Sequence, residues 1–209
     1  MSNRLTPDIS TRKAPRQTRS ASLVADILDA AAQVLAREGA ARFTTARVAE
    51  KAGVSVGSLY QYFPNKAAIL FRLQADEWQE TAGLLRGILS DTGRPPLARL
   101  RGMVHAFLRS ECEEAQLRTA LGDAAPLYRQ APEAQAPRVT GTRIVQDFMR
   151  EALPGASDAS RAMAGDLIMT TMDQVCSHFS ETARTEAEID AYANAMADMF
   201  EAYLGRVGT

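Results

Sequence analysis

The stretch that most constrains how this chain can fold is Thr44–Lys66, which reads TTARVAEKAGVSVGSLYQYFPNK. Its leading threonine pair can cap a short helix over residues 45–52, because a hydroxyl oxygen accepts a hydrogen bond from a free N–H of the first turn. Gly53 predicts the end of this helix, since glycine readily adopts the left-handed conformation. Ser55 then predicts the cap of a second helix, which Pro64 stops. Two short helices joined by a turn of about three to four residues predict a helix-turn-helix.

Further helices are predicted on both sides of this unit. From about residue 20 to Glu38 apolar residues recur at helical spacing, and Gly39 marks the end of that helix. Phe43 is expected to fill the gap between it and the helix-turn-helix. After Pro64, a cap at Asn65 opens a helix of about 25 residues that stops in the Asp91–Pro96 segment.

The rest of the chain keeps helical periodicity, and no strand pattern is found in it. We expect helices near residues 97–114, 116–121, 134–153, 159–182 and 186–204. The predicted fold class is therefore all-α, with about nine helices: a three-helix head that carries the helix-turn-helix, and a larger helical domain. The predicted organisation is a disordered basic arm (1–19), a domain that carries the helix-turn-helix (20–66) and a larger helical domain (67–209).

The charge is distributed unevenly along the chain. The net charge is −1, but residues 1–66 hold ten basic against five acidic side chains, whereas residues 67–209 hold fourteen against twenty. A basic domain attracts phosphates and an acidic one repels them, so this asymmetry favours DNA contact by the first domain alone. The basic tail is either solvated or an arm that follows the DNA backbone or enters the minor groove.

Several other classes of protein are disfavoured. No apolar run is long enough to span a membrane and no signal peptide is recognised, so a cytoplasmic protein without membrane attachment is expected. Cys112 and Cys176 are too few and too far apart for a disulfide framework. Cys176 and His178 do not share a helix face, which disfavours a metal site, and a thiol sensor remains an alternative. No catalytic motif is present, so we expect no enzyme and no cofactor.

The capped helix, the glycine turn, the GSLYQYF segment and the Pro-Asn-Lys that leads into a long helix together resemble the TetR family of bacterial transcriptional regulators. The resemblance covers roughly residues 20–75. It implies an all-α homodimer that binds a palindromic double-stranded DNA operator, with a C-terminal domain for dimerisation and a small-molecule ligand. The C-terminal sequence diverges widely in this family, so the resemblance does not name the ligand.

Ten residues are predicted to contact DNA. Those of the recognition helix can meet base edges or phosphates, and Gln61 suits a bidentate contact with adenine. The resemblance implies DNA contacts for Tyr60 and a phosphate contact for Lys66. Packing against the head is the alternative for Tyr62, and simple capping is the alternative for the pair at the start of the preceding helix. The full set is Thr45, Arg47, Ser55, Val56, Gly57, Ser58, Tyr60, Gln61, Tyr62 and Lys66.

The larger domain is rich in methionine and aromatic residues, which adapt to varied apolar ligands. Either an effector pocket or an ordinary core accounts for them. The candidate pocket residues are Trp78, Met103, Phe107, Tyr128, Phe148, Met149, Met169 and Met172.

The last two long helices are predicted to pair with those of a second copy, as the resemblance implies. Their small residues permit close helix approach, although packing within one chain is an equal alternative. The leading function is a repressor released from its operator by a small apolar or amphipathic effector. The alternative is a ligand-independent DNA-binding regulator controlled by a protein partner.

Overall fold

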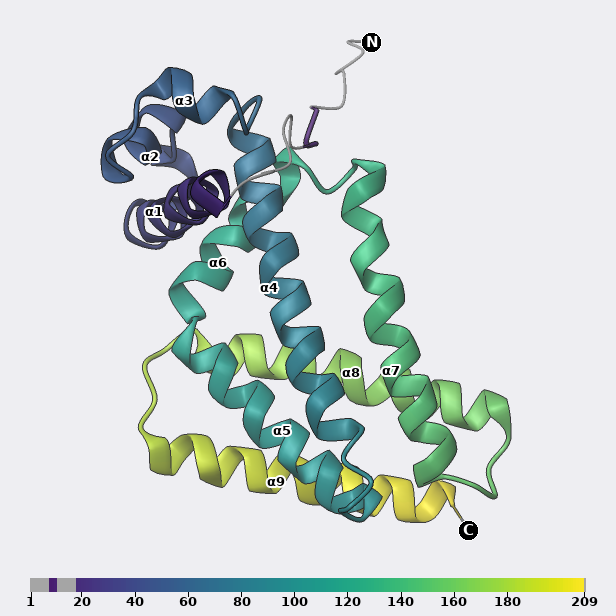
Figure 1. Cartoon of the computed structure of the whole chain (residues 1–209). Coiled ribbons are helices and arrows are strands. Elements are labelled where there is room, and N and C mark those ends of the chain that lie inside the picture. The colour runs from purple at the N-terminus through teal and green to yellow at the C-terminus, as the bar shows by residue number, and fades with distance from the viewer. Residues whose placement is uncertain (1–7, 11–17, 209) are drawn as a thin grey trace, which may run out of the picture. The chain divides into compact units, whose positions relative to one another are not determined.

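The computed structural model describes residues 8–10 and 18–208, and within these ranges the chain is all-α (Figure 1). This confirms the predicted fold class. The nine α-helices of the described part are α1 (Thr18–Arg42), α2 (Thr45–Lys51), α3 (Val56–Tyr60), α4 (Lys66–Leu89), α5 (Pro96–Glu113), α6 (Ala115–Ala124), α7 (Ala136–Ala152), α8 (Asp158–Ser180) and α9 (Glu186–Val207). Two short 3₁₀ helices, Ala125–Leu127 and Pro132–Gln135, join α6 to α7. None of the described helices is long and apolar enough to cross a lipid bilayer.

The chain divides into two compact units. The head unit comprises the described residues up to Trp78 together with Gln116–Pro137, and the body unit comprises Gln79–Ala115 and Arg138–Thr209. Helix α4 thus contributes its first half to one unit and its second half to the other. The boundary between the units falls after Trp78 and not after residue 66. This is because the first half of α4 and most of α6 bury their apolar faces in the same core as α1–α3.

The head unit is built by local signals. Thr44 caps α2 by accepting a hydrogen bond from the Arg47 N–H, and Gly53 follows with a φ of +68°, a conformation that strains any residue with a Cβ. Ser55 caps α3, and Leu59 and Phe63 are fully buried on its inner side. The two helices of the predicted helix-turn-helix are therefore present, although α3 ends at Tyr60 and a turn carries the chain to Pro64.

The first helix and the arm differ from expectation in two places. Gly39 does interrupt α1, with a φ of +74°, but helical residues continue to Arg42. Residues 8–10 of the predicted disordered arm are placed, because Ile9 is an apolar side chain that the head core buries to 3% exposure. Residues 1–7 and 11–17 of the predicted arm lie outside the described part of the chain.

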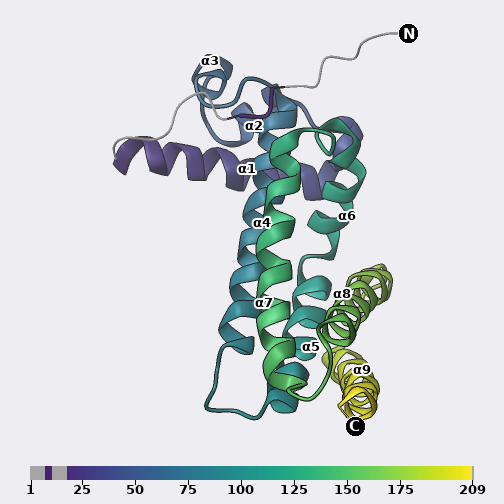
Figure 2. The same ribbon diagram turned by 90° about the vertical axis from the view of Figure 1, so that its right-hand side faces the viewer.

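The body unit is organised around α5. Helices α8 and α9 lie side by side, and α5 packs against both of them (Figures 1 and 2). Gly165 of α8 permits a close approach to α7, since a Cβ at this position would lie 3.0 Å from Cγ1 of Val145. Thr185 opens α9 with a capping box in which the Glu188 carboxylate accepts from the Thr185 N–H at 2.8 Å.

Candidate nucleic-acid interface

The first turn of α3 presents small polar groups to solvent. The Ser55 hydroxyl accepts from the Ser58 N–H at 3.0 Å and lies 2.9 Å from the Ser58 hydroxyl. Ser55 and Gly57 are exposed, and the Val56 side chain is 39% exposed. The Ser55 hydroxyl, which accepts a hydrogen bond from a free N–H of the first turn, can also contact a phosphate. The exposed Val56 side chain beside it can contact a thymine methyl group.

Tyr60 and Gln61 follow on the exposed side of this element. The Tyr60 ring is 40% exposed, and its hydroxyl lies 3.1 Å from Oγ1 of Thr45 in α2. This hydrogen bond ties the two helices of the helix-turn-helix together, so Thr45 orients Tyr60. Gln61 is exposed at the end of α3, which leaves its amide free to meet a base edge.

Arg47 is exposed but already engaged. Its guanidinium forms an ion pair with Glu38 of α1 and donates to the Arg42 carbonyl at 3.3 Å. Thr44 rather than Thr45 caps α2, so simple capping does not account for Thr45. To contact a phosphate, the Arg47 guanidinium must either bind the phosphate and Glu38 together or break its ion pair with Glu38.

Tyr62 is buried, and the prediction that it lies on the exposed face is wrong. It was expected on the exposed face with Tyr60 and Gln61, but its side chain is 6% exposed and belongs to the head core. The reason is that α3 ends at Tyr60, and the turn that follows rotates Tyr62 inward beside Phe63. The alternative of packing against the head describes this residue.

Lys66 is exposed at the first position of α4, where the free N–H groups of a helix favour an anion. Asn65 caps this helix, as predicted, by accepting from the Ala68 N–H at 2.9 Å. The Asn65 side chain also donates to the Asp8 carbonyl at 2.8 Å. The start of α4 is therefore held to the segment that precedes α1.

The residues predicted to line an effector pocket fall in both units. Trp78 and Tyr128 belong to the head unit, whereas the other six candidates belong to the body unit. Within the body unit they are core: five are at most 6% exposed, and Met169 is packed partly buried against them. The five are Met103, Phe107, Phe148, Met149 and Met172. The methionine and aromatic side chains predicted to line a pocket fill the space between α5, α7, α8 and α9.

Tyr128 has a structural role in the head unit. Its hydroxyl donates to the Gln74 side chain at 3.2 Å and lies 3.3 Å from the Leu121 carbonyl, and its ring contacts Phe71. Burial raises the pKa of Tyr128 to about 12, so the phenol stays neutral and acts as a hydrogen-bond donor in this core.

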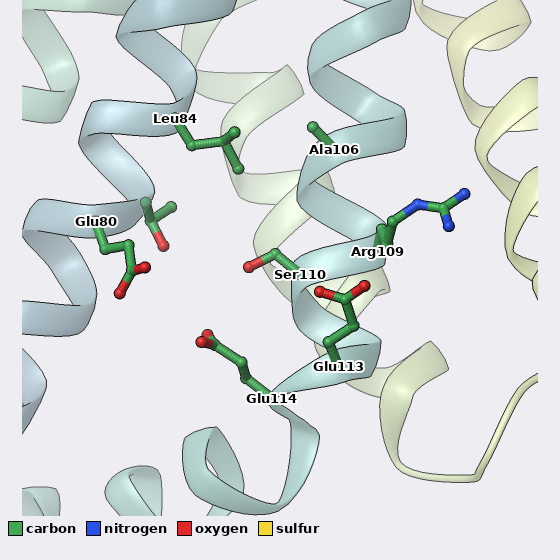
Figure 3. Close-up of a pocket in the computed structure, with 8 residues that line it drawn as sticks. Glu80, Leu84, Ala106, Arg109, Ser110, Glu113 and Glu114 are labelled. Atoms are coloured by element: carbon green, nitrogen blue, oxygen red, sulfur yellow. The ribbon is translucent and has the colours of Figure 1, made fainter. Parts of the chain in front are cut away.

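Two pockets of the body unit are lined by other residues. One of about 350 Å³ lies between α4 and α5 and contains Glu80, Glu113 and Glu114 together with Ser110 (Figure 3). In Figure 3 the Arg109 side chain extends away from the glutamates, and it pairs with Glu186 and Asp190 of α9. The second pocket, of about 340 Å³, lies at the end of α4 and is lined by α5 and α7. Of the predicted pocket residues, only Phe148 lines either one.

The thiols are poor candidates for a sensor. Burial raises the pKa of Cys176 to about 12 and also raises the pKa of Cys112, so neither is held as a thiolate at neutral pH. Within the described residues no group of three or more His, Cys, Asp or Glu side chains is arranged to hold a metal ion.

Comparisons with known proteins define the class. The sequence profile for "Bacterial regulatory proteins, tetR family" matches residues 27–73, which contain α2, α3 and the start of α4. The profile "Tetracyclin repressor-like, C-terminal domain" matches residues 95–207, more than half of the chain. The chain therefore belongs to the TetR family and is a DNA-binding transcriptional regulator.

Curated relatives are similar to shorter stretches of this chain. The nucleoid occlusion factor SlmA of Vibrio campbellii is 40% identical over 85 residues, and that of Vibrio cholerae is 51% identical over 43 residues. These matches span 40% and 20% of this chain and 42% and 22% of the relatives, so less than half of each relative is matched.

Solved structures share the fold at low sequence identity. A putative transcriptional regulator from Pseudomonas aeruginosa PAO1 has a TM-score of 0.72 at 17% identity, over 92% of this chain and 96% of that one. The fatty acid degradation regulator FadR from Bacillus halodurans has a TM-score of 0.68 at 16% identity, over 90% and 96%.

Proposed function

We propose that this protein is a repressor that binds a palindromic operator as a homodimer and is released by a small effector bound in the body unit. The observation that carries the proposal is the exposed surface formed by α3 and the start of α4 in the head unit. Four of its side chains are polar and exposed: Ser55, Tyr60, Gln61 and Lys66. Such a surface suits a helix that enters the major groove beside a phosphate-binding helix terminus.

Within this surface the proposed roles differ. Gln61 is proposed to read a base, because its amide offers a donor and an acceptor that match adenine in the major groove. Lys66 and the Ser55 hydroxyl are proposed to hold phosphates, which position the protein without reading sequence. Tyr62 is proposed only as support, since its ring lies in the head core.

The dimer is proposed to form through α8 and α9, because each carries large apolar side chains that face solvent. Met163 is 68% exposed and Leu167 is 48% exposed on α8, and Met199 is 52% exposed on α9. Met163 and Leu167 are spaced by one helical turn and so share a face. A face of this kind supports burial against a second copy, which would bring two heads to half-sites roughly 34–36 Å apart.

The small residues of these helices serve two different purposes. Ala164, Gly165, Ala193 and Ala197 are buried inside the body unit, so packing within one chain accounts for them. Ala162, Ala191 and Ala195 are exposed and remain available to a second copy.

A second candidate is a DNA-binding regulator controlled by a protein partner. It is favoured by the identity to proteins named nucleoid occlusion factors and by the packed state of the predicted apolar pocket. A thermal-shift screen separates the two, because only a ligand-responsive protein gains stability from small molecules.

The operator is found by selecting bound fragments from genomic DNA and measuring affinity for the selected site by fluorescence anisotropy. We expect a two-fold symmetric site, with binding lost when either half is scrambled. A site without symmetry that binds one chain would overturn the proposal.

The dimer is tested by sedimentation of the double variant Met163→Glu/Met199→Glu. We expect monomers and weak operator binding, since each glutamate would place a charge in the apolar interface. Leu127→Glu is the matched control: Leu127 is 37% exposed in the head unit, so its replacement should leave the dimer intact. An unchanged dimer in the double variant would remove α8 and α9 as the interface.

A further inference from the structure

The second pocket of the body unit contains a buried cation with an unused donor. Arg99, on the first turn of α5, lines this pocket and is only 1% exposed. Its Nη1 donates to the Leu89 carbonyl at 2.6 Å, and its Nη2 pairs with Glu151 of α7. Its Nε is buried and has no hydrogen-bond partner among the described residues. A buried donor left unpaired is costly, so a small shift of the surrounding side chains that lets a ligand oxygen accept from it would be favoured.

The charges around this pocket leave one cation unbalanced. Glu151 is paired with Arg99, and Asp147 is paired with Arg150 at 2.8 Å. Both carboxylates of the pocket wall are therefore neutralised by arginines. Arg86, in the last turn of α4, also lines the pocket, is exposed, and makes no ion pair with the described residues. The pocket thus complements a ligand with a single negative charge.

The rest of the wall combines hydroxyl and apolar groups. Ser90 and Thr92, in the turn after α4, add hydroxyls that can donate to an anion. Leu89 and Phe148 provide apolar surface opposite them. The Arg99 guanidinium lies 5.6 Å from the centre of the Phe148 ring, within the range at which an aromatic face attracts a cation. A volume of about 340 Å³ accommodates a small organic molecule.

We propose that this pocket binds a small amphipathic carboxylate, with the carboxylate between Arg86 and the Arg99 Nε–H and the apolar part along Leu89 and Phe148. This names the effector class and the site for the proposed function, and it rests on that function only for the link to DNA release. Binding itself depends on the residues of the pocket alone. The acidic pocket between α4 and α5 would repel the same ligand.

The test is isothermal titration of the full chain, without DNA, with three probes that share one alkyl chain: octanoate, 1-octanol and octylammonium. We expect octanoate to bind and the two others to bind at least about tenfold more weakly, because only the carboxylate makes charge-assisted hydrogen bonds with the arginines. Arg86→Gln should weaken octanoate binding by about tenfold and leave 1-octanol unchanged.

Arg37→Gln is the matched control, since Arg37 is an exposed arginine of α1 in the head unit. It should bind octanoate as the unaltered chain does. Equal binding of all three probes, or octanoate binding that Arg86→Gln leaves unchanged, would overturn the pocket proposal. Thermal unfolding of Arg86→Gln checks that the variant is folded, which its exposed position favours.

A second measurement separates this proposal from the proposed function. Operator affinity is measured by anisotropy with and without saturating octanoate. A loss of affinity that Arg86→Gln suppresses supports both. Binding that Arg86→Gln weakens, with operator affinity unchanged, supports the pocket and overturns its role in release. Release of DNA by octanoate with no effect of Arg86→Gln overturns the pocket and leaves the repressor proposal standing.

Discussion

The head unit and the body unit each have a separate apolar core, but they present their functional groups differently. In the head unit the polar groups proposed to contact DNA are exposed on short helices. Each of these helices is capped by a side chain that bonds a backbone N–H three residues further along the chain. In the body unit the groups that line the proposed effector pocket come from α4, α5 and α7, and Arg99 pairs with a residue 52 positions away. We therefore expect single substitutions on the exposed DNA surface to leave the fold of the head unit intact. Substitutions of packed residues around the pocket should disturb the body unit as well.

The sharpest test of this comparison is truncation of one phenylalanine in each core. Phe63 in the head unit is fully buried and Phe200 in the body unit is 3% exposed. Each change to alanine should cost about 3–5 kcal/mol of unfolding free energy, because it removes buried apolar surface and leaves a cavity. Calorimetry and sedimentation measure the result.

The two variants should differ in which property is lost first. Phe63→Ala should abolish operator binding while the chain stays dimeric, and Phe200→Ala should weaken the dimer while isolated head contacts to DNA persist. Loss of both properties together in both variants would mean that the two cores behave as one cooperative unit.

The second test concerns sequence reading. Gln61→Ala should change the preference at one base pair by about 1–3 kcal/mol, because a bidentate amide contact is lost. Anisotropy on the operator and on each single-base variant measures it. Gln116→Ala, which alters an exposed glutamine of α6, should change nothing. A uniform loss on operator and random DNA would make Gln61 a phosphate contact instead.

The same contrast explains what the sequence could and could not predict. The caps at Thr44, Ser55 and Asn65 and the glycine turn at Gly53 were predicted because each signal acts within four residues. The burial of Tyr62 could not be predicted in this way, because it depends on where α3 ends and on the core that α1, α4 and α6 form around it.

The body unit was predicted as a set of helices but not as a set of contacts. Composition cannot distinguish a methionine that lines a cavity from one that fills it, so the sequence predicts pocket residues at Met103 and Met172, which the structure buries in the body core. No local pattern marks Arg99, because its partner Glu151 lies on another helix, and in the sequence Arg86 has the appearance of an ordinary exposed arginine.

Helix caps provide a smaller and matched pair of tests. Ser55→Ala and Thr185→Ala each remove a side-chain cap, of α3 and α9 respectively, and each should cost about 1 kcal/mol of unfolding free energy. Urea denaturation measures this cost. Only Ser55→Ala should also weaken operator binding, because only its hydroxyl faces the proposed DNA surface. Weaker operator binding in both variants would show that affinity follows stability rather than the hydroxyl.

The smallest expected effect is on the salt dependence of DNA binding. Lys66→Ala should weaken binding to all DNA sequences alike and reduce the slope of log affinity against log salt by about 1, since one phosphate contact is lost. Arg143→Ala, an exposed arginine of α7, serves as the control and should leave the slope unchanged. Because Lys66 opens the helix that enters both units, an altered sequence preference in Lys66→Ala would mean that it orients α3 as well as holding a phosphate. Titrations on operator and random DNA at several salt concentrations distinguish these outcomes: a phosphate contact acts equally on both, whereas an orienting residue acts on the operator alone.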